Sequence, residues 1–540
     1  MRRARALLRR AARVPRLVTA ADTETNVALA MNRREFLRMT ALAGAIPFGV
    51  RSLTAGVAPA APGPDMLLIM PDQMRGDCLS CRGHPVVRTP QLDGLAERGV
   101  LFSRAYTPVA SCIPARYALL TGLCPQTSGV VGFAAKPFST PPLPELLRRA
   151  GYAAVLVGRY MHQVPGSGAC GYGRRILGST HVDGDDYDTF LKDAAPETGG
   201  IRKLVERLGL TYNHWQAAPW PLADELHPTE WIVARSRAVI AEADPGTPLF
   251  LTTSFYAPHP PLFPPKKHFE TCATRNLPAP AHGEWVDWSA LSPKGDQNGH
   301  RVLLEGETLH AAQAGYFGLI EHIDSRIDPL IREFTARSEK AGRPWVIVVT
   351  SDHGEMLGDH GYFRKCEPYE GSANIPFIIC GSPELGFACG RRVTQPVCLE
   401  DIMPTLLALA GSKSPARVDG VDLVPALRGG TQAIREWLHF EHAPCYSQAQ
   451  AYHALTDGRF KYIWRPADGS EQLFDLDRDP REERDLSKDA ACLAVLQVWR
   501  QRLVDRLVER PEGFSQHGKL VAGRTYRALN KGALTEDRRS

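Results

Sequence analysis

One short segment combines a nucleophile with a fixed positive charge. Residues 111–116 read Ser-Cys-Ile-Pro-Ala-Arg, and Pro114 suits the first turn of a helix that Gly122 would end. Cys112 then lies at a helix N-terminus, where free N–H groups and the helix dipole favour an anion. Arg116, one turn later, adds a positive charge near the same point. Two interpretations follow: a thiolate nucleophile with a lowered pKa, or a buried cysteine beside a helix cap.

A second set of residues has the types that bind a divalent cation. Asp72, Asp352 and His353 offer two carboxylates and one imidazole, and Gln73 offers a carbonyl oxygen. Asp352 and His353 are adjacent, so both reach one metal only if the backbone bends there, which Gly354 permits. The alternative is that these side chains are helix caps or surface ion pairs.

The elements that position these residues are strands. Apolar runs that read as buried strands alternate with helical stretches, which predicts an α/β fold with a large, mostly parallel sheet sandwiched by helices. Carboxyl ends of parallel strands share one edge of the sheet, where ligands bind. Four predicted strands end there in titratable residues: 65–70 with Asp72, 152–157 with Arg159 and His162, 248–255 with His259, and 344–349 with Asp352 and His353.

The chain divides by composition into four parts. Residues 61–390 carry the strand–helix alternation, interrupted by loop-rich insertions at 163–225 and 265–308 without clear periodicity. Residues 391–514 predict a smaller α+β subdomain, with antiparallel strands within 451–464. Residues 515–540 read as a polar, loosely attached tail.

Residues 1–60 read as an export signal. Arg33-Arg34 precedes an apolar run at 39–50 and a small-residue cleavage site at 58–60, and the first 30 residues read as an over-extended start. The pattern is similar to a twin-arginine signal, which implies the twin-arginine export machinery as a partner and a periplasmic or secreted protein. These residues hold 11 arginines and 3 acidic residues, so without them the formal charge changes from +5 to −3. That balance gives no case for a nucleic-acid partner, and no apolar run is long enough to span a membrane.

The sequence contains twelve cysteines and does not determine which of them form disulfides. If Cys112 is modified, eleven remain, so at least one is unpaired within a monomer. Cys78 and Cys81 have redox or zinc spacing, but no second pair completes a zinc site, and we interpret them as structural. Export permits disulfides without requiring them.

The motifs together resemble the type I, formylglycine-dependent sulfatases of the alkaline phosphatase-like superfamily. The resemblance rests on C-x-P-x-R followed by L-x-T-G at 112–122, with Ala115 where the family usually has Ser. Further motifs appear in the family's order over nearly all of the chain after the signal, at 89–93, 258–261, 351–360 with Lys365, 369–370, 404–407 and 473–476. Asp72-Gln73, where the family commonly has two Asp, resembles the branch of choline sulfatases and phosphonate monoester hydrolases.

The resemblance implies sulfate-ester hydrolysis by Cys112 converted to 3-oxoalanine (formylglycine) by the formylglycine-generating enzyme. One hydroxyl of the aldehyde hydrate would attack sulfur, and the second would allow sulfate to leave. Arg116 would steady the hydrate, and Lys365 and His259 would contact the sulfate and the leaving group. The family's G-K-x-H is replaced by Gly-Arg159-Tyr-Met-His162, with Arg for Lys and one residue added.

The resemblance also implies a divalent metal held by Asp72, Gln73, Asp352, His353 and the modified Cys112. Calcium is the family's usual metal, and a shell with fewer carboxylates and an imidazole also suits manganese or zinc. The substrate would be a sulfated small molecule or sugar, which the sequence does not identify. The alternatives are a phosphonate or phosphate mono- or diesterase on the same site, and a catalytically silent binding protein that keeps the fold. The oligomeric state is left open.

Overall fold

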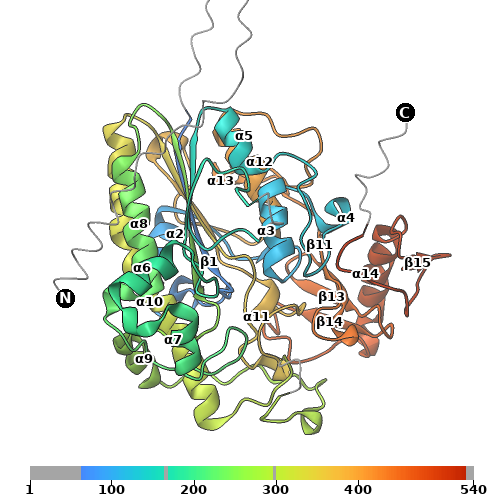
Figure 1. Ribbon diagram of the computed structural model, residues 1–540. Coiled ribbons are helices and arrows are strands. Elements are labelled where there is room, and N and C mark those ends of the chain that lie inside the picture. Colours follow the sequence, from blue (N-terminus) through green and yellow to red (C-terminus); the bar gives the residue numbers. More distant parts are fainter. Residues whose placement is uncertain (1–62, 163–167, 296–299, 531–540) are drawn as a thin grey trace, which may run out of the picture.

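The computed structural model describes residues 63–162, 168–295 and 300–530 (Figure 1). The predicted signal in residues 1–60 lies outside these residues. None of the helices formed in the described ranges combines the length and apolarity that crossing a bilayer requires.

An eight-stranded sheet forms the centre of the molecule. Its strands, in spatial order, are β5 (Arg174–Leu177), β4 (Ala153–Gly158), β6 (Leu249–Pro258), β1 (Asp65–Asp72), β7 (Trp345–Thr350), β8 (Phe377–Gly381), β2 (Gly99–Phe102) and β9 (Arg391–Val393). Only β8 runs antiparallel to its neighbours, β7 and β2, while every other pair in this sheet is parallel. The predicted α/β architecture with a mostly parallel sheet is confirmed.

Helices cover both faces of the sheet because its central strands are apolar on both sides. Along β1, Leu67 and Ile69 face one hydrophobic cluster, and Met66, Leu68 and Met70 face the other. The first cluster contains side chains of α2 (Pro90–Arg98), α6 (Asp186–Ala194), α7 (Ile201–Arg207), α8 (Pro228–Glu242) and α10 (Gly306–Lys340). The second contains side chains of α3 (Cys112–Thr121), α5 (Leu143–Arg149), α12 (Ile402–Leu409) and α13 (Val424–Leu427).

A smaller subdomain packs beside the large sheet, drawn in orange and red in Figure 1. It contains an antiparallel sheet with strand order β11 (Leu438–His442), β12 (Tyr452–Thr456), β13 (Phe460–Trp464) and β14 (Glu471–Asp475). Helix α14 (Leu493–Arg506) packs against this sheet through Trp499 and Leu503. The antiparallel strands predicted within 451–464 are therefore present as β12 and β13.

The ends of the predicted subdomain differ from what composition indicated. Strand β9 and helix α12, which lie after residue 390, pack with the large sheet. The predicted loose tail from residue 515 is attached at several points up to residue 530, although most of residues 516–525 are exposed. It forms β15 (Ser515–Gln516) and β16 (Lys519–Leu520), and buried Tyr526 donates a hydrogen bond to Glu441.

The insertion at 163–225 is more regular than its sequence indicated. It contributes the edge strand β5 and the short helices α6 and α7. Asp185 caps the N-terminus of α6, because its side chain accepts a hydrogen bond from the backbone N–H of Asp188. A few apolar residues at helical spacing pack each helix against the core, such as Ile201, Leu204 and Val205 in α7. A pattern this short is hard to recognise in a sequence rich in glycine and proline.

Candidate active site

Cys112 is the first residue of α3 and is buried. The helix continues through Arg116 and ends at Gly122, whose φ of +66° suits glycine. Polar groups surround the sulfur: His353 Nε2 at 3.2 Å, Lys365 Nζ at 3.3 Å, and Arg159 Nη2 at 3.7 Å. The β-substituent of residue 112 therefore lies among hydrogen-bonding and charged groups.

The sheet order explains how residues far apart in sequence reach this point. Strands β4, β6, β1 and β7 are adjacent, and all four run parallel. Arg159 directly follows β4, His259 follows β6, Asp72 ends β1, and Asp352 lies two residues beyond β7. The structure thus brings the predicted strand-end residues together at one edge.

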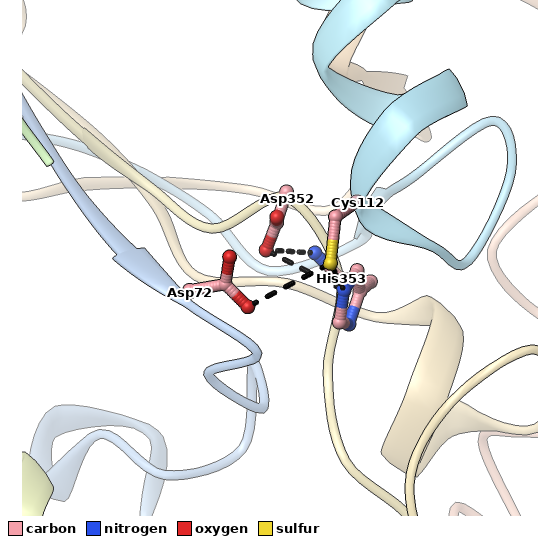
Figure 2. Close-up of side chains that lie close together, drawn as sticks. All are labelled: Asp72, Cys112, Asp352 and His353. Carbon is pink, nitrogen blue, oxygen red and sulfur yellow. Dashed lines mark hydrogen bonds and ion pairs between the residues drawn. The ribbon is translucent and has the colours of Figure 1, made fainter. Parts of the chain in front are cut away.

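Four of the five predicted metal ligands converge (Figure 2). One ligand atom from each of Asp72, Cys112, Asp352 and His353 lies within 4.8 Å of the other three, and all four residues are buried. His353 donates from Nδ1 to the carbonyl of Gly354 at 2.9 Å, which leaves Nε2 facing the cluster. Metal-binding imidazoles commonly make this backbone contact because it fixes the tautomer. The donor set therefore fits a divalent cation.

The fifth predicted ligand, Gln73, is engaged elsewhere. Its Oε1 accepts a hydrogen bond from Lys365 Nζ at 2.8 Å, and its Nε2 donates to Glu355. Glu355 is buried and also accepts from the backbone N–H groups of Leu357 and Arg364. Sequence reasoning gave Glu355 no role, although it lies inside the 351–360 motif. The predicted ligation by Gln73 stays a prediction.

Two arginines neutralise the carboxylates of the cluster. Arg116 donates from Nη2 to Asp72 at 2.6 Å and from Nε to Asp352 at 2.9 Å, and all three side chains are fully buried. Arg159 Nε lies 2.7 Å from the same Asp72 oxygen. Nη1 of Arg116 donates to the carbonyl of Tyr160 and also contacts Met161 Sδ and Ser254 Oγ, so Arg116 is fixed in place and positions the two carboxylates. Its predicted role on the hydrate stays a prediction.

Burial and these charges set opposite protonation tendencies for the two carboxyls. Burial raises the pKa of Asp72 to about 7, although Arg159 opposes the rise. Burial also favours a higher pKa for Asp352, but the charges of His353 and Arg116 outweigh this effect and hold the pKa of Asp352 well below its usual range. Asp352 is therefore the more firmly ionised of the two.

His259 and Lys365 differ in charge. Burial, with Lys365 and Arg159 nearby, lowers the pKa of His259 well below its usual value, so its imidazole is neutral. His259 Nδ1 donates to the carbonyl of Pro260 at 2.7 Å, which leaves Nε2 for another partner. Burial opposes the charge on Lys365, but Cys112 and Asp72 raise the pKa of Lys365 above its usual value. Lys365 is therefore a cation.

A pocket of about 220 Å³ opens onto Cys112. His162 lines it and pairs with Arg159 through Nε2 at 2.8 Å, so the extra residue before His162 does not remove it from the site. No carboxylate lines this pocket among the described residues. The lining residues that sequence reasoning did not single out are Phe133, His181, Tyr212, Asn213, Arg364, Cys445 and Tyr446. No motif marks them, because they come from separate loops and meet only in the fold.

The sequence of this chain is similar to those of known proteins. A sulfatase family model matches residues 64–412, and a model described as N-sulphoglucosamine sulphohydrolase, C-terminal, matches residues 358–509. An arylsulfatase of Clostridium perfringens is 34% identical over 486 residues, covering 85% of this chain and 98% of the relative. A choline-sulfatase of Rhizobium meliloti is 29% identical over 451 residues, covering 79% and 83%.

Solved structures agree with the fold. The phosphonate monoester hydrolase of Agrobacterium radiobacter matches with a TM-score of 0.70 at 26% identity, covering 82% of this chain and 95% of that chain. A phosphonate monoester hydrolase of Silicibacter pomeroyi matches with a TM-score of 0.65 at 25% identity, covering 86% and 100%. The predicted alkaline phosphatase-like architecture is confirmed.

Proposed function

The chain belongs to the sulfatase family and hydrolyses sulfate esters, and from that premise we propose that Cys112, converted to formylglycine, is its nucleophile and that a divalent metal binds beside it. One observation carries the proposal: the side chain of residue 112 lies within 4.8 Å of two carboxylates and an imidazole and also contacts two cations. This is the environment that a sulfate ester needs, because its oxygens carry negative charge and its sulfur must be approached by an oxygen nucleophile.

Lys365 and Arg159 bind the sulfate group of the substrate. Both contact the Cys112 sulfur and both are buried, so their positive charge acts at low dielectric on whatever anion lies there. Arg159 presents a planar fork suited to two sulfate oxygens, and its guanidinium is steadied over the ring of Tyr256 at 4.4 Å. Lys365 is held by Gln73, which fixes the direction of its ammonium group.

His259 transfers the proton that the departing alcohol requires. The neutral imidazole has Nε2 available because Nδ1 is bonded to Pro260. The negative charge of a bound sulfate ester raises the pKa of a neighbouring imidazole, so substrate binding prepares His259 to act as an acid. Arg116 takes no part in this transfer and keeps Asp72 and Asp352 in place.

A divalent metal and the formylglycine would complete the site. Asp72, Asp352, His353 and residue 112 would hold the metal, which would supply Lewis-acid activation of sulfate oxygens. The formylglycine hydrate would supply one hydroxyl for attack and a second whose deprotonation releases sulfate. The converging oxygens favour calcium, and the imidazole leaves manganese and zinc as alternatives.

The peptide mass of the segment containing Cys112 tests the nucleophile. In protein made with the formylglycine-generating enzyme present, we expect a loss of about 18 Da and loss of activity in Cys112→Ala. Cys389→Ser, which changes an exposed cysteine, is the matched control and should keep activity. An unmodified thiol in fully active protein would exclude the formylglycine mechanism. An unmodified thiol in inactive protein would favour a silent binding protein or a missing maturation step.

Metal and substrate are tested together. After removal of metal with a chelator, we expect activity on an aryl sulfate to be lost and the melting temperature to fall, because Asp72 and Asp352 then lose a shared cation. Adding back calcium, manganese or zinc separately identifies the metal that restores both. Parallel assays on aryl sulfates, phosphates and phosphonates decide the second candidate, phosphonate or phosphate ester hydrolysis, which the phosphonate monoester hydrolase neighbours favour.

The substrate is a sulfated small molecule or sugar, in keeping with the arylsulfatase and choline-sulfatase relatives. We also propose that the protein is exported through the twin-arginine machinery to the periplasm or beyond. The support is the Arg33-Arg34 pattern with its apolar run and small-residue site. Cell fractionation of the full chain and of an Arg33→Lys, Arg34→Lys variant tests export.

A further inference from the structure

Two cysteines that the proposed reaction does not use meet at the wall of the pocket. Cys366 directly follows Lys365, and Cys445 lies in the loop between β11 and β12. The residues beside them are in contact, since the guanidinium carbon of Arg364 lies 4.7 Å from the centre of the Tyr446 ring, and the Cys366 and Cys445 side chains perturb one another's ionisation. Cys366 is buried, whereas Cys445 lines the pocket that contains Cys112. All twelve cysteines of the chain lie in the described ranges, and all are thiols there.

Each of the two cysteines belongs to a segment that touches the catalytic centre. The backbone N–H of Cys366 donates to the carbonyl of Ala110 at 2.8 Å, two residues before Cys112. From the other side, Gln450 donates from Nε2 to the carbonyl of Lys365 at 3.5 Å. A covalent bond between the two sulfurs would therefore join segments that already meet around Lys365.

The two thiols are chemically unequal, as in reactive dithiol pairs. The neighbouring Cys366 side chain lowers the pKa of Cys445, against the effect of burial, and Lys365 and Arg364 add to the lowering. Burial raises the pKa of Cys366 well above its usual value. Cys445 thus combines thiolate character with access from the pocket, and Cys366 is the buried partner that can reach it.

We propose that Cys366 and Cys445 form a disulfide that cross-links the Lys365 segment to the C-terminal subdomain. The oxidant is a disulfide compound, small or carried by a thiol oxidase. The Cys445 thiolate attacks one of its sulfurs, forming a mixed disulfide and expelling one thiolate. Cys366 loses its proton and attacks the Cys445 sulfur, expelling the second thiolate. Two protein thiols give up two protons and two electrons, and the oxidant is reduced to two thiols.

Peptide mapping tests the bond directly. Full-length protein is treated with oxidised glutathione or with dithiothreitol, alkylated while denatured, and digested with trypsin. We expect residues 366–391 and 436–459 to appear as one linked species after oxidation and as two alkylated peptides after reduction. Because Cys380 and Cys389 share the first peptide, fragmentation must place the bond at Cys366.

Variants and melting temperature supply the second test. Cys445→Ser should abolish the linked species, and Cys389→Ser, which changes an exposed cysteine of the same peptide, should keep it. Oxidation should raise the melting temperature of the unaltered protein by about 5 °C and leave that of Cys445→Ser unchanged. No linked species after oxidation, or the same linked species in Cys445→Ser, would overturn the proposal. Neither readout depends on sulfatase activity.

Discussion

Arg116 is fully buried between two carboxylates that come from different strands. Replacing it with alanine leaves Asp352 without its arginine partner, while Asp72 keeps only Arg159. Removing one partner from such a buried group typically costs about 3–5 kcal/mol of folding free energy. We expect Arg116→Ala to lose that much in chemical denaturation. Arg116→Lys should recover only part of the loss, because an ammonium group lacks the planar fork that reaches both carboxylates.

The control for Arg116 is an exposed ion pair. Arg202 and Asp183 lie 2.9 Å apart with side chains 55% and 58% exposed, and exposed pairs contribute less than about 1 kcal/mol. Arg202→Ala should therefore be nearly neutral. Equal losses in the Arg116 and Arg202 variants would show that the buried network is not what holds the two carboxylates.

His259 makes a prediction about leaving groups. If it protonates the departing oxygen, His259→Ala should lower kcat by about 10²–10⁴-fold for sulfates of poorly acidic alcohols. The loss should be much smaller for 4-nitrophenyl sulfate, whose leaving group needs little protonation. The dependence of kcat on leaving-group pKa, measured over a series of aryl sulfates, should become steeper in the variant. His517→Ala, at an exposed position, should change nothing. A uniform loss over the series would instead give His259 a sulfate-binding role.

At the residue scale, the sequence predicted the side chains that belong to contiguous motifs. Cys112, Asp352 and His353 carry recognisable neighbours, and the structure brings them together. The contacts among these side chains could not be predicted from the motifs. Side-chain directions, which only the packed loops fix, decide that Arg116 spans Asp72 and Asp352 and that Lys365 bonds to Gln73.

At the scale of elements, strands were predicted better than short helices for a physical reason. A buried parallel strand such as β7 is a continuous apolar run, which few other structures produce. Helices α6 and α7 bury only a few residues each, so their pattern is weak. The order of strands in the sheet could not be predicted, because sequence does not state which strands are neighbours, and it is this order that brings β4, β6, β1 and β7 together.

Helix α2 is joined to α10 by a carboxylate with an unusual pKa. Asp324 of α10 accepts hydrogen bonds from the backbone N–H groups of Leu92 at 2.9 Å and Gln91 at 3.2 Å, in the first turn of α2. Burial raises the pKa of Asp324 from 3.8 to about 7. The folded state therefore binds this proton more tightly than the unfolded state does. The contribution of Asp324 to stability is largest below pH 3.8 and falls as the pH rises towards 7.

Asp324→Asn isolates that dependence. The amide keeps one acceptor oxygen but cannot ionise, so we expect the variant to be less stable than the parent protein at pH 5 by about 1–3 kcal/mol. The deficit should shrink by pH 8, since only the parent protein bears a buried charge there. Denaturation curves of both proteins at pH 5 and pH 8 measure this difference in stability. Asp328→Asn, four residues along the same helix and paired with exposed Arg332, should show no such trend. A deficit of the same size at pH 5 and pH 8 would mean that Asp324 is already ionised at pH 5.

At the scale of the molecule, the C-terminal subdomain is part of the active-site structure. Lys461 of β13 is fully buried and lies 2.7 Å from Glu370, in α11 (Glu370–Ala373), and 2.7 Å from Glu482. Helix α11 begins five residues after Lys365, in the same polypeptide segment. Composition indicated a separate subdomain beyond the catalytic part, but no sequence pattern indicated that a lysine of its sheet would hold the loop that carries Lys365.

Lys461→Met should therefore affect both stability and catalysis. The methionine fills the space but leaves Glu370 and Glu482 without their cation, at an expected cost of about 3–5 kcal/mol. Burial already raises the pKa of Glu482 to about 7 with the lysine present, and removing the lysine raises it further. A carboxyl with a raised folded-state pKa contributes less to the stability of the folded protein as the pH rises. The stability deficit of Lys461→Met should therefore be larger at pH 8 than at pH 5. Arg459→Met, beside the same strand but 51% exposed, is the matched control and should be nearly neutral in stability and in kcat/KM. If Lys461→Met is destabilised equally at both pH values, the lysine packs the interface and does not neutralise its carboxylates.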